Sequence, residues 1–165
     1  MVAFLQEEPH WIENKKVLEI GAGIGLPSFS IANKVSNIII SDYDKEAVAL
    51  ANKNITHLHL SNCKALVLDW NDIPEHIISD TILLSDTNYN PTDFDALVIS
   101  ITKFLNIGCN IVLATPNRIT TNPFIEKLNG FIHKTKNYCI IEEAIEKEIA
   151  VFVLKRHKTL AQNLC

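Results

Sequence analysis

The chain has 165 residues, a length that suits a single domain with a buried core. Hydrophobic residues make up 47% of it, and its formal net charge is −4 at pH 7. This composition is typical of a globular protein and excludes the strongly basic field that attracts nucleic-acid backbones without sequence preference. We therefore expect no nucleic-acid partner. One basic run, residues 155–158, is expected to belong to a solvated, frayed end of the chain at 155–165.

The cysteines and the N-terminal residues limit the cellular setting. Cys63, Cys109, Cys139 and Cys165 form no C-x-x-C pair, so the sequence signals neither a zinc site nor a disulfide framework, and no metal is expected. Residues 1–16 lack the charged-then-apolar layout of a signal peptide, and no apolar run approaches transmembrane length. These features predict reduced thiols, a cytoplasmic location and no membrane partner.

The N-terminal part predicts one short helix followed by a strand and a glycine-rich turn. Residues 1–15 contain an amphipathic helical pattern, and residues 16–20 predict a buried strand. Gly21, Gly23 and Gly25 follow, so the backbone there is open to a ligand. A helix then begins near Leu26 or Pro27, with the proline suited to a first helical turn, and extends to about residue 33.

The glycine spacing separates several kinds of nucleotide site. A dinucleotide fingerprint requires its third glycine at position 26, which is Leu26, and a phosphate-binding loop requires a Gly-Lys-Ser/Thr that does not follow. The pattern E-x-G-x-G-x-G instead resembles motif I of class I S-adenosylmethionine-dependent methyltransferases. The resemblance implies that Glu19, Gly21, Gly23 and Gly25 face the methionine and ribose parts of S-adenosyl-L-methionine. The alternative is a turn that only lets a helix pack closely on a strand.

Short β-branched runs alternate with helical stretches further along, which predicts parallel strands joined by crossover helices. The second strand is expected at residues 37–41, a helix capped by Asp44 extends to about residue 53, and the third strand covers residues 64–68. In an open sheet of this type the ligand binds beyond the carboxyl ends of the strands. Residues that follow each strand are therefore the candidate site.

Asp42, Tyr43 and Asp44 follow the second strand. An acid there can accept hydrogen bonds from both ribose hydroxyls, and Asp42 is the stronger candidate because Asp44 serves as the helix cap. Tyr43 is taken as a neighbour in the cofactor site. The same acid suits the ribose of a dehydrogenase cofactor, so it indicates a nucleotide without choosing one.

The third strand ends in Leu68-Asp69-Trp70. Trp70 can cover the flat face of a purine, although burial in the core is an equal alternative. The Leu-Asp-Trp sequence resembles the family of seven-strand protein-lysine methyltransferases related to nicotinamide N-methyltransferase. In that family the aspartate and its neighbours lie near the adenine, which implies this place for Asp69 and Trp70.

The fourth strand, residues 81–85, ends in Ser85, which we include among the cofactor-binding residues, and Asp86 to Tyr89 follow. Asp86 and Tyr89 match the D/E-x-x-Y/F signature of the same lysine methyltransferase family. Adenine and glutamine N-methyltransferases are similar to one another in having Asn-Pro-Pro-Tyr here. Because Thr87 and Asn88 replace both prolines, a planar amide acceptor is disfavoured. The alternative is a turn that only serves the backbone before the next helix.

The chemistry of lysine methylation fits this pair. The amine must arrive neutral and close to the methyl carbon, whereas free lysine has a pKa of roughly 10.4. Tyr89 could supply an aromatic wall that lowers this pKa by desolvation and interacts with the cationic groups. Asp86 could position the amine by accepting an N–H, although its charge opposes deprotonation of a lysine. These are the two expected catalytic residues.

The last part of the chain completes the sheet. A helix is expected from Pro91 to Gly108, a fifth strand at residues 110–114 and a last helix at residues 122–133. Residues 115–118 follow the fifth strand, where either an acceptor-side loop or a plain turn could lie. Two strand-like runs, residues 138–142 and 149–154, lie too close together for a crossover helix, so they predict an antiparallel hairpin.

This α/β arrangement resembles the Rossmann-like, doubly wound methyltransferase sheet of order 3-2-1-4-5-7-6, with strand 7 antiparallel. We expect one domain over residues 1–165: a short N-terminal helix at 1–15, the core at 16–154 and the tail. The predicted function is methyl transfer from S-adenosyl-L-methionine to an amine, with a protein lysine as the leading acceptor. A small-molecule N-methyltransferase and a non-catalytic cofactor-binding protein are the alternatives. The family usually has a longer N-terminal segment, so a homodimer could complete the site.

Overall fold

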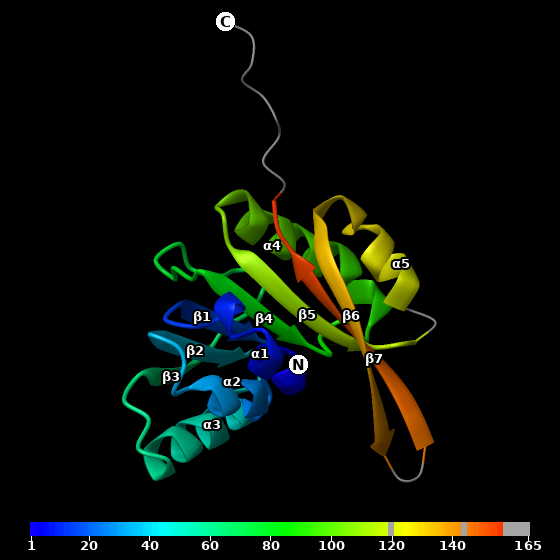
Figure 1. Ribbon diagram of the computed structural model, residues 1–165. Helices are drawn as coiled ribbons and strands as arrows, with labels where there is room; N and C mark the ends of the chain where they lie inside the picture. The colour runs from blue at the N-terminus through cyan, green and yellow to red at the C-terminus, as the bar shows by residue number, and fades with distance from the viewer. Residues whose placement is uncertain (119–120, 143–144, 157–165) are drawn as a thin grey trace, which may run out of the picture.

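The computed structural model describes residues 1–118, 121–142 and 145–156. Its centre is a seven-stranded sheet in the order β3-β2-β1-β4-β5-β7-β6 (Figure 1). The strands are β1 (Lys16–Ile20), β2 (Asn37–Asp42), β3 (Cys63–Val67), β4 (Thr81–Ser85), β5 (Asn110–Pro116), β6 (Ile132–Glu142) and β7 (Ile145–Leu154). Strands β1 to β5 are parallel, and β7 is antiparallel to both of its neighbours. The predicted strand order is confirmed.

Helices cover both faces of this sheet (Figure 1). The α-helices are α1 (Val2–Glu7), α2 (Leu26–Ile31), α3 (Lys45–His57), α4 (Phe94–Asn106) and α5 (Thr121–Glu126). Short 3-10 turns lie at η1 (Pro9–Trp11), η2 (Pro91–Asp93) and η3 (Asn129–Phe131). Helices α4 and α5 pack on one face, and α1, α2 and α3 pack on the other.

The strands are buried on both faces, so successive side chains enter two different cores. Leu18 and Ile20 of β1 pack in the core that contains α4 and α5. Val17, which alternates with them, packs in the core that contains α1 and α2. The same alternation points Glu19 towards α2, which determines its surroundings in the site below.

The N-terminal segment packs against the sheet. Phe4 and Leu5 of α1 are fully buried, and the Thr81 hydroxyl of β4 donates to the carbonyl of Trp11 at 2.6 Å. The Tyr138 hydroxyl of β6 donates to a carboxylate oxygen of Glu7 at 2.8 Å. These contacts join residues that lie 70 and 131 positions apart in the sequence, so the N-terminal segment is held by distant strands.

The helix predicted over residues 122–133 is wrong in its second half. Helix α5 ends at Glu126, η3 follows, and β6 begins at Ile132, which pairs with Leu154 of β7. Pairing along the sheet edge decides the conformation there, and this long-range contact overrides the local helical pattern. Beyond the pairing of Pro116 with Ile149, β6 and β7 continue as a hairpin that projects past the sheet (Figure 1).

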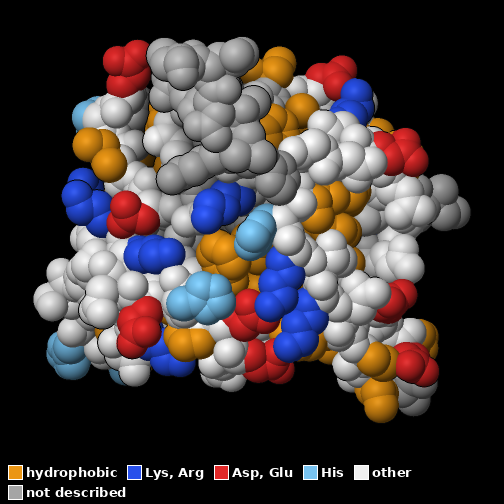
Figure 2. Space-filling model, turned by 45° about the horizontal axis from the view of Figure 1, so that its top comes forward, with side chains coloured by type: hydrophobic (Ala, Val, Ile, Leu, Met, Phe, Trp, Pro, Cys, Tyr) orange, Lys and Arg blue, Asp and Glu red, His pale blue; other side chains and the backbone are white. Residues whose placement is uncertain are grey.

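The described surface carries charges of both signs. On the face in Figure 2, Lys and Arg side chains lie among Asp and Glu side chains. No helix within the described ranges is long and apolar enough to cross a membrane. In the same part of the chain, no three His, Cys, Asp or Glu side chains are grouped so that they could hold a metal ion. Most of the tail predicted at 155–165 lies outside the described residues, which end at Arg156.

Candidate active site

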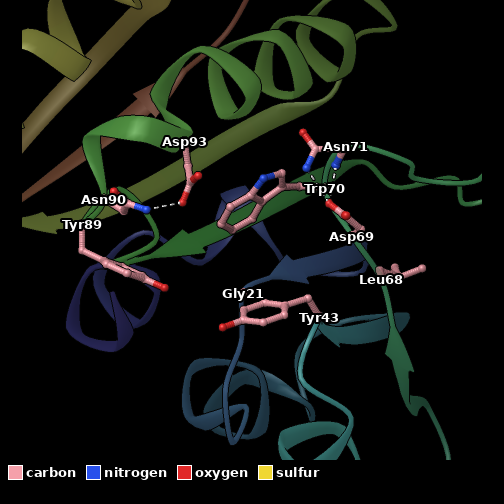
Figure 3. Close-up of a pocket in the computed structure, with 9 residues that line it drawn as sticks. All are labelled: Gly21, Tyr43, Leu68, Asp69, Trp70, Asn71, Tyr89, Asn90 and Asp93. Carbon is pink, nitrogen blue, oxygen red and sulfur yellow. Dashed lines mark hydrogen bonds between the residues drawn. The ribbon is translucent and has the colours of Figure 1, made fainter.

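Two adjoining cavities lie at the carboxyl ends of β1 to β4, with volumes of about 330 and 230 Å³. They share four lining residues: Gly21, Tyr43, Trp70 and Tyr89. Figure 3 shows the three aromatic side chains around the larger cavity, each coming from a different loop. The larger cavity is also lined by Leu68, Asp69, Asn71, Asn90 and Asp93, and the smaller by Gly23, Asp42, Asp44, Ala47, Asp86 and Thr87.

The three glycines of the turn after β1 have different surroundings. A β carbon added at Gly21 would lie 2.8 Å from Cγ2 of Thr87, so glycine allows β1 to approach the loop after β4. A β carbon at Gly23 would meet nothing within 4 Å and would enter open space beside the smaller cavity. Gly25 lines neither cavity, and its β carbon would lie 3.0 Å from Cγ2 of Ile40. Gly25 therefore serves the packing of α2 on β2.

Asp42 joins this turn to the end of β2. Its Oδ2 accepts from the backbone N–H of Gly23 at 2.7 Å, and its Oδ1 accepts from that of Asp44 at 3.0 Å. A carboxylate oxygen can accept more than one hydrogen bond, so Asp42 keeps acceptor capacity towards the smaller cavity that it lines. Asp44 accepts from the N–H of Glu46 at 2.8 Å and caps α3, which confirms its predicted role as the helix cap.

Glu19 lies beneath the turn and lines neither cavity. It is fully buried; its Oε2 accepts from the backbone N–H of Ser28 at 3.1 Å and also from the Ser28 hydroxyl. Its Oε1 has no partner within the described part of the chain. Burial raises the pKa of Glu19 to about 7, and the hydrogen bonds from Ser28 oppose the rise. In this geometry Glu19 ties β1 to α2 and supports the turn from below.

Trp70, in the loop after β3, lines both cavities. It also packs, partly buried, against the core that contains α4. The same side chain therefore belongs to the core and to the cavity wall. Asp69 lines the larger cavity, and its Oδ1 accepts from the backbone and side-chain nitrogens of Asn71, both at 2.8 Å (Figure 3). Ser85, the last residue of β4, lines neither cavity and pairs with Ala114.

Asp86 turns the chain away from the sheet immediately after β4. Its φ of +56° is in the left-handed region, which aspartate tolerates better than most residues, and its N–H donates to the carbonyl of Ala114 at 2.8 Å. Its carboxylate lines the smaller cavity and accepts two hydrogen bonds from Arg118. The Oδ1–Nη1 distance is 2.5 Å and the Oδ2–Nη2 distance is 2.8 Å.

The sequence alone did not single out Arg118, because residues 115–118 could form either an acceptor-side loop or a plain turn. It lies 32 positions after Asp86, and adjacent parallel strands β4 and β5 bring the two together. The hydrogen bonds to Asp86 raise the pKa of the guanidinium, so it stays charged. The sequence does show a cation after the strand that neighbours β4. Only the fold shows that its side chain turns towards Asp86.

Tyr89 and Thr87 complete the acceptor side. The Tyr89 side chain lines both cavities and is 58% exposed, so its ring is open to a ligand (Figure 3). Thr87 lines the smaller cavity, and its buried hydroxyl has no partner among the described residues. Both side-chain amide atoms of Asn88 are likewise buried and unpaired in that part of the chain. Unpaired buried polar groups are costly, so the Thr87 hydroxyl is a candidate contact for a bound ligand.

A sheet of this order, with a glycine turn after its first strand, defines the class I methyltransferase fold. The family model described as lysine methyltransferase matches residues 1–131. The chain therefore belongs to this lysine methyltransferase family.

Curated relatives and solved structures agree with this membership. The chain is 28% identical over 135 residues to the histone-arginine methyltransferase METTL23 of Mus musculus, covering 78% of this chain and 53% of the relative. It is 31% identical over 121 residues to the histidine protein methyltransferase 1 homolog of Dictyostelium discoideum, covering 70% and 39%. The chain thus spans about half or less of these relatives.

Among solved structures, the N-methyltransferase NodS of Bradyrhizobium japonicum, in complex with S-adenosyl-L-homocysteine, superposes with a TM-score of 0.70. The two share 16% sequence identity, and the match covers 87% of this chain and 80% of NodS. At this identity the likeness establishes the shared fold.

Proposed function

We propose that this chain is an S-adenosylmethionine-dependent methyltransferase that acts on an amine of a protein, with lysine as the leading acceptor. The observation that carries the proposal is the pair of adjoining cavities. They bring the glycine turn, Asp42 and Trp70 beside Asp86 and Tyr89. Family membership and relatives named as protein methyltransferases support the same reaction.

The residues present fit S-adenosylmethionine. Gly23 leaves open space beside the smaller cavity, and the carboxylate of Asp42 has spare acceptor capacity for ribose hydroxyls. The rings of Tyr43 and Trp70 offer flat faces for a purine at the shared wall of the cavities. When bound, the cofactor supplies an electrophilic methyl group on a sulfonium. Glu19 and Gly25 are proposed to shape this site from below, because neither lines the cavities.

On the acceptor side, Tyr89 would desolvate the incoming amine and Asp86 would orient it through an N–H hydrogen bond. The family description favours lysine, whereas the two named relatives act on arginine and histidine according to their names. Lysine is therefore proposed first, and a small-molecule amine is the second candidate.

The acceptor class can be tested with methyl-labelled cofactor, the purified chain and a cell lysate. We expect label in the protein fraction, and mass spectrometry should then find it on lysine. Label on arginine or histidine would correct the acceptor residue, and label confined to small metabolites would favour the second candidate. Binding of S-adenosylhomocysteine without any transfer would favour a non-catalytic protein.

Replacing Asp86 or Tyr89 with alanine should reduce methyl transfer by about a hundredfold or more, because each variant loses a group that positions the acceptor. Affinity for S-adenosylhomocysteine, measured by calorimetry, should stay within about threefold, since other residues hold the cofactor. Asp95→Ala is the matched control: this acid is exposed on α4 and pairs with Lys127. Full activity in both site variants would contradict the acceptor assignment.

We also propose a cytoplasmic location and a homodimer. The cysteines, which form no C-x-x-C pair and signal no disulfide framework, support a reducing compartment. Sedimentation velocity over a range of concentrations would measure the oligomeric state.

A further inference from the structure

The pair formed by Asp86 and Arg118 is fixed from both sides. Asp86 is held by its backbone hydrogen bond to Ala114 and by its left-handed conformation. The backbone N–H of Arg118 donates to Oγ1 of Thr121 at 3.3 Å, and the N–H of Thr121 donates to the carbonyl of Arg118 at 3.0 Å. The Thr121 hydroxyl also donates to the carbonyl of Pro116 at 2.8 Å. The backbone of Arg118 is thus held by hydrogen bonds to Thr121, the first residue of α5.

An unpaired carboxylate would hinder the proposed reaction. It would stabilise the ammonium form of an arriving lysine, whereas only the neutral amine can attack a methyl group. The smaller cavity has further acids, Asp42 and Asp44, and no Lys or Arg is among the described residues that line it. Beyond the pair, Glu148 accepts from Nδ2 of Asn117 at 3.1 Å. Tyr43 and Tyr89 also line the smaller cavity, so the titratable groups among its described lining residues are acids and phenols.

We propose that Arg118 is a positioning residue of the acceptor site: its guanidinium orients the Asp86 carboxylate and offsets its charge, so that the amine enters neutral. The inference rests on the proposed function. In the transfer, the lone pair of the amine nitrogen forms the new C–N bond while the C–S bond breaks and its electron pair stays on sulfur. The methylated ammonium then releases its proton to water. A fixed cation next to the amine favours the neutral form before this step.

The test compares wild type, Arg118→Gln and Arg118→Lys, with Lys127→Gln as the matched control. The side chain of Lys127 is about as exposed as that of Arg118, and it forms an ion pair at 2.9 Å with Asp95, outside both cavities. Transfer of labelled methyl groups into lysate protein is followed between about pH 6 and pH 10, at saturating cofactor.

Arg118→Gln should move the rising limb of the pH–rate profile to higher pH by about one unit, which is about a tenfold loss of rate near neutrality. The rate should recover towards the wild-type value at the alkaline end. Arg118→Lys keeps the charge but loses the two-point hydrogen bonding, so its profile should shift less. Lys127→Gln should follow the wild-type profile. A loss of rate in Arg118→Gln that is equal at every pH would overturn the proposal, because it would indicate a structural role only.

A second measurement tests the pairing of Asp86 with Arg118 and does not depend on methyl-transfer activity. The chain has two arginines, Arg118 and Arg156, so labelling with ¹⁵N-arginine gives few side-chain signals, which Arg118→Gln assigns. Slow rotation of the Arg118 guanidinium, lost in Asp86→Asn, is the expected result; free rotation in wild type would overturn the pairing. If the pair is present but wild type transfers no methyl group at any pH, the proposed function fails and this inference fails with it. If wild type is active and its profile coincides with that of Arg118→Gln, only the inference fails.

Discussion

Glu19 shows how one side chain can serve a site without lining it. The carboxylate is fully buried on the α2 side of the sheet and holds the backbone and hydroxyl of Ser28. Motif resemblance implied contact with the cofactor, whereas the strand alternation turns this side chain away from both cavities. Its contribution to binding is therefore expected to act through the position of the glycine turn.

Burial of Glu19 makes stability depend on pH. The pKa of this carboxyl is about 7 in the folded chain and 4.5 when exposed, so the folded state binds the proton more tightly. The contribution of Glu19 to stability is then fully present below pH 4.5 and is lost as the pH rises through 7. Relative to Glu19→Gln, the free energy of unfolding of wild type should fall by roughly 2–3 kcal/mol between pH 5 and pH 8. Urea denaturation at both pH values measures this; an unchanged difference would contradict a buried titrating carboxyl.

Asp86 and Arg118 show how a partner from another strand changes what a single side chain can do. The sequence identified Asp86 through its place after a strand and its spacing from Tyr89. It gave no means to see that the carboxylate is paired, because the partner comes from the next strand. An isolated acid would attract an ammonium ion, and a paired acid is suited to orient a neutral amine.

At the scale of elements, two glycines in the turn between β1 and α2 have different roles: one leaves space for a ligand, and the other allows close packing. Gly23 borders open space at the smaller cavity, and Gly25 fits against Ile40 and Phe29. Both have positive φ values, +53° and +78°, so alanine at either position brings backbone strain of about 1–2 kcal/mol. Only the second would also create a steric conflict inside the fold.

Gly23→Ala and Gly25→Ala should therefore differ in what they lose. Gly23→Ala should weaken S-adenosylhomocysteine binding about tenfold or more at a stability cost of about 1–2 kcal/mol, because its methyl group projects beside the cavity. Gly25→Ala should cost a further 1–3 kcal/mol or so by overpacking. Calorimetry and urea denaturation of both variants separate the effects. Equal stability losses with unchanged affinity in both would contradict this division.

The elements that the sequence predicted best are those with a continuous apolar run. The bounds predicted for β1 and β4 agree with the structure, and β2, β3 and β5 differ only at their ends. Helix α3 extends to His57, four residues beyond the predicted end. The failure at Ile132 has a different cause, since that segment becomes a strand through pairing with β7. The local sequence pattern predicts well which segments are buried, but it predicts poorly which strands pair with one another.

At the scale of the whole molecule, the candidate site exists only where the sheet assembles. Loops after four strands meet at one edge, and none of them forms a cavity alone. S-Adenosylhomocysteine at about a hundred times its Kd should raise the free energy of unfolding by about 2.7 kcal/mol, because it binds only the folded chain. Thermal unfolding with each ligand measures the effect. NAD should give no shift, since Leu26 stands where a dinucleotide site has its third glycine; stabilisation by NAD would contradict the cofactor assignment.

By itself, the sequence determined the α/β fold class and the resemblance to lysine methyltransferases, because apolar runs, glycine spacing and strand ends are local signals. The strand order was expected only from that resemblance. Tertiary structure alone decided that Glu19 lies beneath the site, that Arg118 pairs with Asp86 and that Trp70 belongs to the core and the cavity together. These facts depend on the face to which a strand directs each side chain and on which strands are neighbours. Both properties arise from packing between distant segments, which no local pattern encodes.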